Sequence, residues 1–77
     1  MMTFKKISEN GSKISYKVSA VGIDGIIVID KDSDEIYFDS VSGFLSDSET
    51  EKNNILYHAS KRIRDCNFAD KVIYATH

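Results

Sequence analysis

The sequence predicts an α+β fold, in which a small, mostly antiparallel β-sheet of ββββαβ order carries one amphipathic helix on one face. Two observations predict this class. Segments in which apolar and polar residues alternate fill the first half of the chain, and short turn signals separate them, as is typical of strands with one buried face. A single stretch with apolar residues at helical spacing follows, and then one more short apolar segment. Because there is no proline and no low-complexity linker, residues 1–77 are predicted to form a single domain.

The first two strands are predicted on either side of Asn10-Gly11. Asn-Gly favours a type I′ turn, which needs positive φ at both central residues. From Lys13 to Ala20 apolar and polar residues alternate, so one face of this strand is expected to be buried. Upstream, Phe4 and Ile7 differ in parity and cannot both point inward. We therefore expect a β-bulge near Lys5-Lys6.

The next turn is predicted at residues 22–25, and strands follow at residues 26–30 and 35–39. If the turn between these strands is tight, their apolar side chains divide between two faces, although a one-residue slip would exchange the faces. One face would carry Ile27, Ile29, Ile36 and Phe38. The opposite face would carry Ile26, Val28 and Tyr37.

The helix is predicted to begin near Ser46, because two overlapping segments that start at Ser46 and Ser48 have the capping-box form. Asn67 is the expected left-handed cap at its other end. Residues 71–76 are predicted to form a last strand that is apolar on both faces, which favours a place inside the sheet rather than at its edge. The core expected beneath the helix consists of Ile14, Tyr16, Val18, Ile27, Ile29, Ile36, Phe38, Ile55, Ala59 and Ile63.

The composition narrows the class of function. The chain is 42% hydrophobic and 29% charged, which is ordinary for a folded protein, and its formal charge of −2 shows no basic excess of the kind that nucleic-acid binders carry. The lone cysteine, Cys66, cannot form a disulfide within the chain. The longest apolar run, residues 26–29, falls far short of the ~20 residues of a membrane helix. We expect a cytoplasmic protein with no membrane association.

The apolar residues outside the expected core predict a protein-binding surface. One helix covers only one face of a sheet, so the side chains on the other face are left for a partner. These residues are Ile26, Val28, Tyr37 and, from the last strand, Ile73. They predict a non-enzymatic module that covers a surface of a larger protein, as an inhibitor or adaptor does. A homodimer joined through the same surface is the alternative occupant.

In its size, its few motifs and its near-neutral charge, the chain resembles the small inhibitors encoded by phages and mobile elements, anti-CRISPR proteins among them. It is similar in the same respects to bacterial immunity proteins. This is a resemblance of type, and it assigns no functional residue to the chain.

A nucleic-acid-binding module is the alternative function. Lys13 and Lys17 are predicted on the wet face of the second strand, and Lys5 and Lys6 could join them from the first. Such a row of lysines can follow a nucleic-acid backbone. It is equally typical of a solvated strand face that discourages aggregation.

No motif predicts catalysis, a cofactor or a metal. Asp30, Asp32 and Asp34 begin like a calcium loop, but Glu35 and Val41 stand where such a loop needs glycine and glutamate. A polar turn is the simpler interpretation, and whether these carboxylates bind a cation stays open. His58 and Cys66 are predicted on one helix about 12 Å apart, too far for one to activate the other. We expect His58 on a solvated helix face and Cys66 as a buried thiol.

Overall fold

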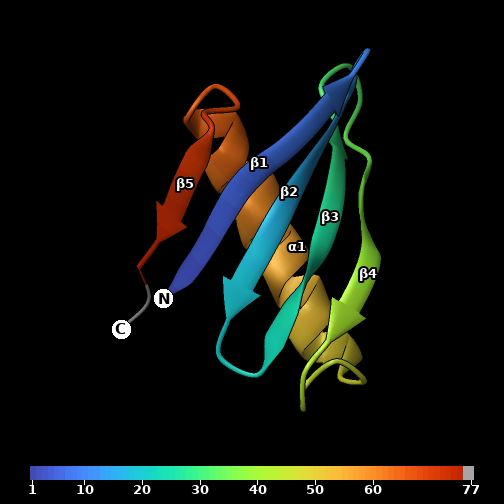
Figure 1. Ribbon diagram of the computed structural model, residues 1–77, viewed down its shortest axis with the longest axis vertical. Coiled ribbons are helices and arrows are strands. Elements are labelled where there is room, and N and C mark those ends of the chain that lie inside the picture. The colour runs from blue at the N-terminus through green and yellow to red at the C-terminus, as the bar shows by residue number, and fades with distance from the viewer. Residues whose placement is uncertain (76–77) are drawn as a thin grey trace.

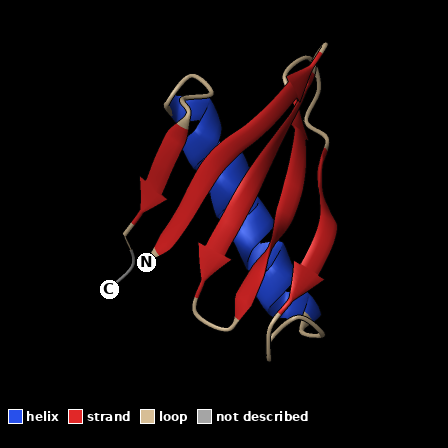
Figure 2. Cartoon of the chain, in the orientation of Figure 1, coloured by secondary structure: helices blue, strands red, loops and turns tan. Residues whose placement is uncertain are grey.

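The computed structural model describes residues 1–75 and shows a five-stranded sheet with one helix (Figure 1). The elements are β1 (Met2–Asn10), β2 (Lys13–Ala20), β3 (Ile23–Asp30), β4 (Ile36–Ser42), α1 (Glu49–Asp65) and β5 (Lys71–Tyr74). The predicted α+β class and ββββαβ order are confirmed. Figure 2 shows α1 crossing one face of the sheet, here called the inner face. No described element covers the opposite, outer face.

All neighbouring strands are antiparallel, and their order in the sheet is β4-β3-β2-β1-β5. β5 is therefore an edge strand, and the expectation that it lies inside the sheet is wrong. Only one side of β5 is buried, because Val72 points into the core whereas Ile73 is 46% exposed. An apolar residue on each side of so short a strand does not require two covered faces.

The first two turns lie at other residues than expected. Asn10 pairs with Lys13, so the loop is Gly11-Ser12 rather than Asn10-Gly11. Gly11 has a φ of 64°, whereas the φ of Ser12 is not positive. Glycine at the first central position is the pattern of a type II′ turn rather than type I′. The second turn is Val21-Gly22, so β3 already begins at Ile23, whose side chain is in the core.

Two bulges adjust which side chains face the helix. In β1 the register with β2 shifts between Lys6 and Ser8, next to the position predicted from sequence, and Ile7 is the extra residue. Phe4 is fully buried, and Ile7 is 50% exposed, so the parity conflict is resolved in favour of Phe4. In β4 the register with β3 shifts at Asp39. Phe38 pairs with Ile27 and Ser40 pairs with Ile26, so Asp39 is the extra residue.

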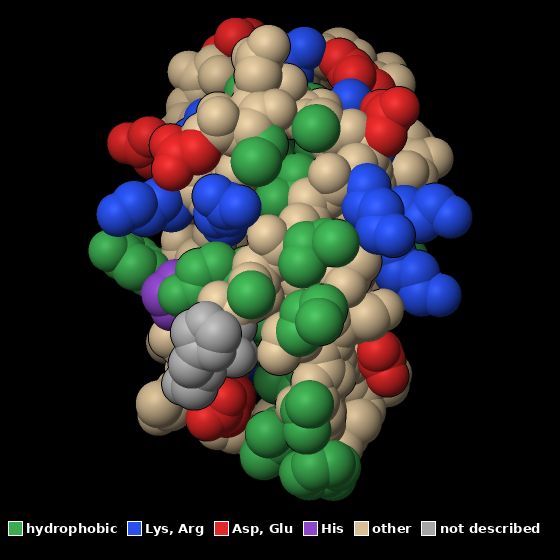
Figure 3. All heavy atoms as spheres, turned by 90° about the vertical axis from the view of Figure 1, so that its left-hand side faces the viewer, with side chains coloured by type: hydrophobic (Ala, Val, Ile, Leu, Met, Phe, Trp, Pro, Cys, Tyr) green, Lys and Arg blue, Asp and Glu red, His purple; other side chains and the backbone are tan. Residues whose placement is uncertain are grey.

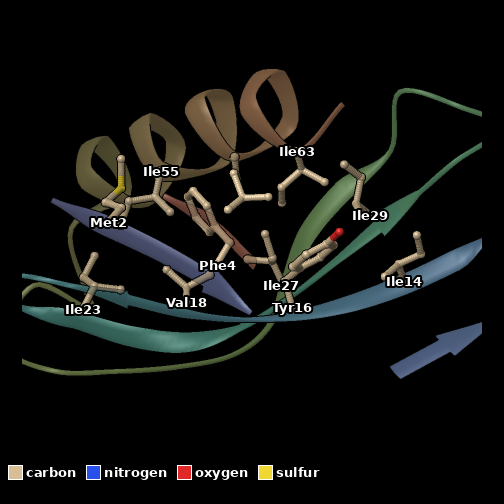
Figure 4. Packing of buried hydrophobic residues seen from close by; sticks show 12 residues of the cluster. Met2, Phe4, Ile14, Tyr16, Val18, Ile23, Ile27, Ile29, Ile55 and Ile63 are labelled. Atoms are coloured by element: carbon tan, nitrogen blue, oxygen red, sulfur yellow. The ribbon is translucent and has the colours of Figure 1, made fainter. Parts of the chain in front are cut away.

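The core lies between the inner face and α1 (Figure 4). All the predicted core residues are buried except Ile36 and Phe38, which pack against the core with part of their surface exposed. Both lie on the edge strand β4, where the sheet shields only one side. The buried residues that the sequence analysis left out are Met2, Phe4, Ile23 and Val72.

Caps fix both ends of α1. The Ser48 hydroxyl accepts a hydrogen bond of 3.3 Å from the backbone N–H of Glu51, so Ser48, which starts the second of the two predicted segments, is the N-cap. The backbone N–H of Ser48 donates to the carbonyl of Leu45 at 3.0 Å rather than to the Glu51 side chain. At the other end Asn67 has a φ of 54°, as predicted. The backbone N–H of Phe68 donates to the carbonyl of Ile63 at 2.9 Å. This bond is the one that closes a helix in a Schellman motif.

Candidate functional site

Three residues of the predicted protein-binding surface meet on the outer face. Ile26 and Val28 are two residues apart on β3, and Tyr37 of β4 lies directly opposite Val28. Ile26 and Val28 are half-buried, and Tyr37 is 40% exposed. We call Ile26, Val28 and Tyr37 the apolar patch. Its members lie on the same face of one pair of neighbouring strands, at directly opposite or next-but-one positions, so they form one surface.

Ile73 does not join this patch. It lies on β5, and β1 and β2 stand between β5 and β3 in the sheet. Three strand spacings amount to roughly 14 Å. The residues that face outward in between are polar, since Thr3 pairs with both Ile73 and Ser19. The two apolar surfaces are therefore separate.

Lys13 borders the apolar patch rather than forming part of an open basic surface. Its ammonium lies 3.1 Å from the Glu35 carboxylate and 5.6 Å from the centre of the Tyr37 ring. The hydrogen bond to Glu35, and then the charge of that carboxylate, raise the pKa of Lys13. The positive charge of Lys13 is therefore compensated by Glu35, and the ammonium lies over the Tyr37 end of the apolar patch.

Of the four lysines predicted for nucleic-acid binding, only Lys5 and Lys17 stand together on the outer face. They are directly opposite each other on β1 and β2. Lys6 pairs with Tyr16, a core residue of the inner face, and its ammonium lies 3.5 Å from Asp70 and 3.6 Å from Glu9. Lys6 and Lys13 are thus both engaged by carboxylates, and the predicted row of four is not formed.

The structure adds a lysine that the sequence analysis did not include. Lys71 of β5 is directly opposite Lys5, so Lys71, Lys5 and Lys17 form a line across three neighbouring strands. We call these three residues the lysine row. Figure 3 looks onto the β5 edge and shows Lys and Arg side chains gathered along its margins. The alternation of residues along the last strand predicts which face of the sheet Lys71 lies on. Its place beside Lys5 follows only from the order of the strands.

Lys31, in the turn that follows β3, is also compensated by a carboxylate. Lys31 lies 2.9 Å from the Glu9 carboxylate, and the hydrogen bond it donates lowers the pKa of Glu9. Within residues 1–75, no carboxylate lies within ion-pair distance of any member of the lysine row. The row is therefore a local concentration of positive charge on a chain whose formal charge is −2.

The aspartates after β3 form a turn of their own. The Asp30 carboxylate accepts a hydrogen bond of 2.8 Å from the backbone N–H of Asp32. The Arg64 guanidinium donates to the carbonyls of Asp30 and Ser33 at 3.0 and 2.7 Å, so α1 holds this turn from the inner side. In the part of the chain that the structure describes, no three His, Cys, Asp or Glu side chains are arranged to hold a metal ion.

A shallow hollow of about 350 Å³ lies between α1 and β5. Its floor is an aromatic pair, because the His58 ring stacks on Tyr74 with 4.5 Å between ring centres and 20° between planes. Tyr57 meets His58 edge-on at 5.2 Å. The expectation of a solvated His58 is wrong, since α1 turns this residue toward β5 and leaves it half-buried. Cys66 is the helix C-cap and packs partly buried against the core.

No protein-family model matches the chain, and no curated protein or solved structure matches it either. None of the described helices is long and apolar enough to cross a membrane.

Proposed function

We propose that the protein is a non-enzymatic binding module that covers a surface of a larger protein with the outer face of its sheet. The observation that carries this proposal is the apolar patch. Ile26, Val28 and Tyr37 are contiguous on neighbouring strands, on the face that α1 does not cover. Contiguous apolar surface on a small protein marks interaction sites, and tyrosine is enriched at the centres of interfaces.

The rest of the chain supports binding rather than chemistry. The hollow between α1 and β5 is lined by an aromatic stack and by charged side chains of α1, and the polar turn between β3 and β4 is engaged in hydrogen bonds within the chain. A rigid sheet face held by a helix is a preorganised surface, which loses little conformational entropy on binding. We place the action of this inhibitor or adaptor in the cytoplasm, where a free cysteine such as Cys66 stays reduced.

The test is capture of a partner by the tagged protein from a bacterial lysate, with mass spectrometry of what is bound. Wild type is compared with Val28→Lys and Tyr37→Ala. Asn53→Lys is the matched control, because it adds the same charge at an exposed position of α1. We expect one stoichiometric protein to be retained by wild type and Asn53→Lys and lost from the other two. Melting curves would confirm that all four proteins are folded.

Two outcomes would contradict this proposal. Unchanged capture by both patch variants would show that the partner binds elsewhere. Recovery of the protein alone, with a wild-type dimer that Val28→Lys dissociates in analytical ultracentrifugation, would assign the patch to a homodimer interface.

A further inference from the structure

The lysine row is an arrangement that destabilises the free protein. Lys5 faces Lys17 on one side and Lys71 on the other. Residues directly opposite each other in an antiparallel pair have Cβ atoms about 4.5–5.5 Å apart, and like charges at that distance repel. Lys5 therefore has a like charge as its direct neighbour on both sides.

Of the five lysines outside the row, all but Lys61 pair with a carboxylate within residues 1–75. Glu9, Glu35, Glu49 and Asp70 each lie within 4.0 Å of a lysine outside the row. Within the described residues none of these carboxylates reaches Lys5, Lys17 or Lys71. Acidic groups of another molecule would therefore interact favourably with the lysine row.

The row and the apolar patch belong to one surface. Lys17 is directly opposite Ile26, the first residue of the patch, so the basic half of the outer face passes into the apolar half without a gap. The two longer extents of the molecule are 32 and 24 Å. A stable interface takes about 800 Å² from each partner, which is about the whole of such a face. A partner that covers the patch must therefore also cover the row.

We propose that the partner presents a carboxylate-rich protein surface, whose acidic side chains lie on the lysine row while its apolar centre lies on the patch. This inference rests on the proposed function and adds the chemistry of the partner to it. A neutral surface would take three ammonium groups out of water without giving any of them a countercharge, which is strongly unfavourable. Carboxylates on the partner remove that cost.

A protein surface fits this face better than the two other occupants. Nucleic acid would place a further phosphate or base on the aliphatic Ile26 and Val28, beside the exposed carboxylate of Asp24 on the same strand. The ring that could stack a base, Tyr37, has the Lys13 ammonium over it. A second copy would bring an identical lysine row, so a two-fold interface over the whole face would bury two rows of three ammonium groups, to which the exposed Asp24 of each copy offers one carboxylate.

The test uses the full chain, labelled with ¹⁵N and titrated at low salt with two probes of equal formal charge: an oligoglutamate peptide and a single-stranded DNA oligonucleotide. The variants are Lys5→Glu and Lys17→Glu. Lys61→Glu is the matched control, because Lys61 is an exposed lysine of α1 and makes no ion pair within residues 1–75.

We expect the peptide to shift the amide signals of Lys5, Lys17 and Lys71, and to bind more tightly than the DNA. Lys5→Glu should weaken peptide binding by about tenfold, the size of effect that reversal of a well-placed interface charge produces, and Lys61→Glu should leave it within about twofold. The melting temperature of Lys5→Glu should not fall, because the substitution replaces two like-charge neighbours by two opposite-charge ones.

Several results would overturn the inference. Peptide shifts away from the row, no shifts at all, or equal affinity of Lys5→Glu and wild type would show that the row does not receive carboxylates. Tighter binding of the DNA would assign the row to nucleic acid. In the lysate experiment, capture that survives Lys5→Glu but not Val28→Lys would leave the proposed function standing and remove only the acidic partner. Capture that survives both would remove the proposed function itself.

Discussion

The phenol of Tyr16 donates a hydrogen bond of 2.9 Å to the backbone carbonyl of Ala69. Tyr16 lies in the middle strand of the sheet with a fully buried side chain, and Ala69 lies in the loop between α1 and β5. This single bond therefore ties the centre of the core to the segment that positions the edge strand. Burial, with a smaller contribution from the charge of Asp70, raises the pKa of Tyr16 to about 12.

Tyr16→Phe should lower the stability at neutral pH by about 1 kcal/mol, because the carbonyl of Ala69 loses its partner. The order of stability should reverse in alkali. A phenol whose pKa is higher in the folded than in the unfolded state contributes stability below about pH 10 and loses it as the pH rises toward about 12. That loss is about 2–3 kcal/mol. Urea unfolding of both proteins across this range tests the prediction, and parallel pH curves would contradict it.

Arg64→Ala should release the turn between β3 and β4. The guanidinium donates to two backbone carbonyls there, those of Asp30 and Ser33. A hydrogen bond that involves a charged group makes a net contribution of about 1.5–3 kcal/mol to stability. We expect a loss of about 2 kcal/mol and faster amide exchange at Asp32. Arg62→Ala is the control, since Arg62 makes one longer contact of 3.5 Å. Equal losses in the two variants would refute the assigned role.

Gly25→Ala should disturb the pairing of β3 with β4. A Cβ on Gly25 would overlap the carbonyl oxygen of Ser40 and approach the Cα of Val41 to 3.1 Å. Because backbone cannot move aside as a flexible side chain can, we expect a loss of about 3 kcal/mol. Gly11→Ala meets no atom within 4 Å and is strained only by its φ of 64°, so it should cost about 1 kcal/mol. Chemical denaturation distinguishes the two, and a smaller loss for Gly25→Ala would contradict the steric argument.

The sequence predicts the elements of this fold well because their signals are local. Alternation in β2 and the apolar stripe of α1 depend on residues within one segment, and Ile14, Ala59 and Ile63 are buried as expected. The apolar patch was also predictable, since the pairing of Val28 with Tyr37 follows from one short turn. Even the shifted turn at Gly11-Ser12 left the facing of β2 unchanged.

The features that cannot be predicted from the sequence are those that depend on which strands become neighbours in the sheet. The place of β5 beside β1 is decided by the packing of the whole chain, and it both separates Ile73 from the patch and sets Lys71 opposite Lys5. The burial of His58 depends on the position of β5 as well, because its stacking partner, Tyr74, is on that strand. Local periodicity carries no information on such neighbours.

The pairing of β1 with β5 also bears on the order in which the fold assembles. β1 to β4 pair with strands adjacent in sequence, whereas Met2 pairs with Tyr74 across almost the whole chain. Contacts between distant residues form slowly, because a long loop must close before they contribute any stability. We therefore expect the four-stranded meander and α1 to fold first and β5 to dock last. Amide protons of Val72 and Tyr74 that exchange no faster than those of β2 would show instead that β5 unfolds only with the rest of the protein.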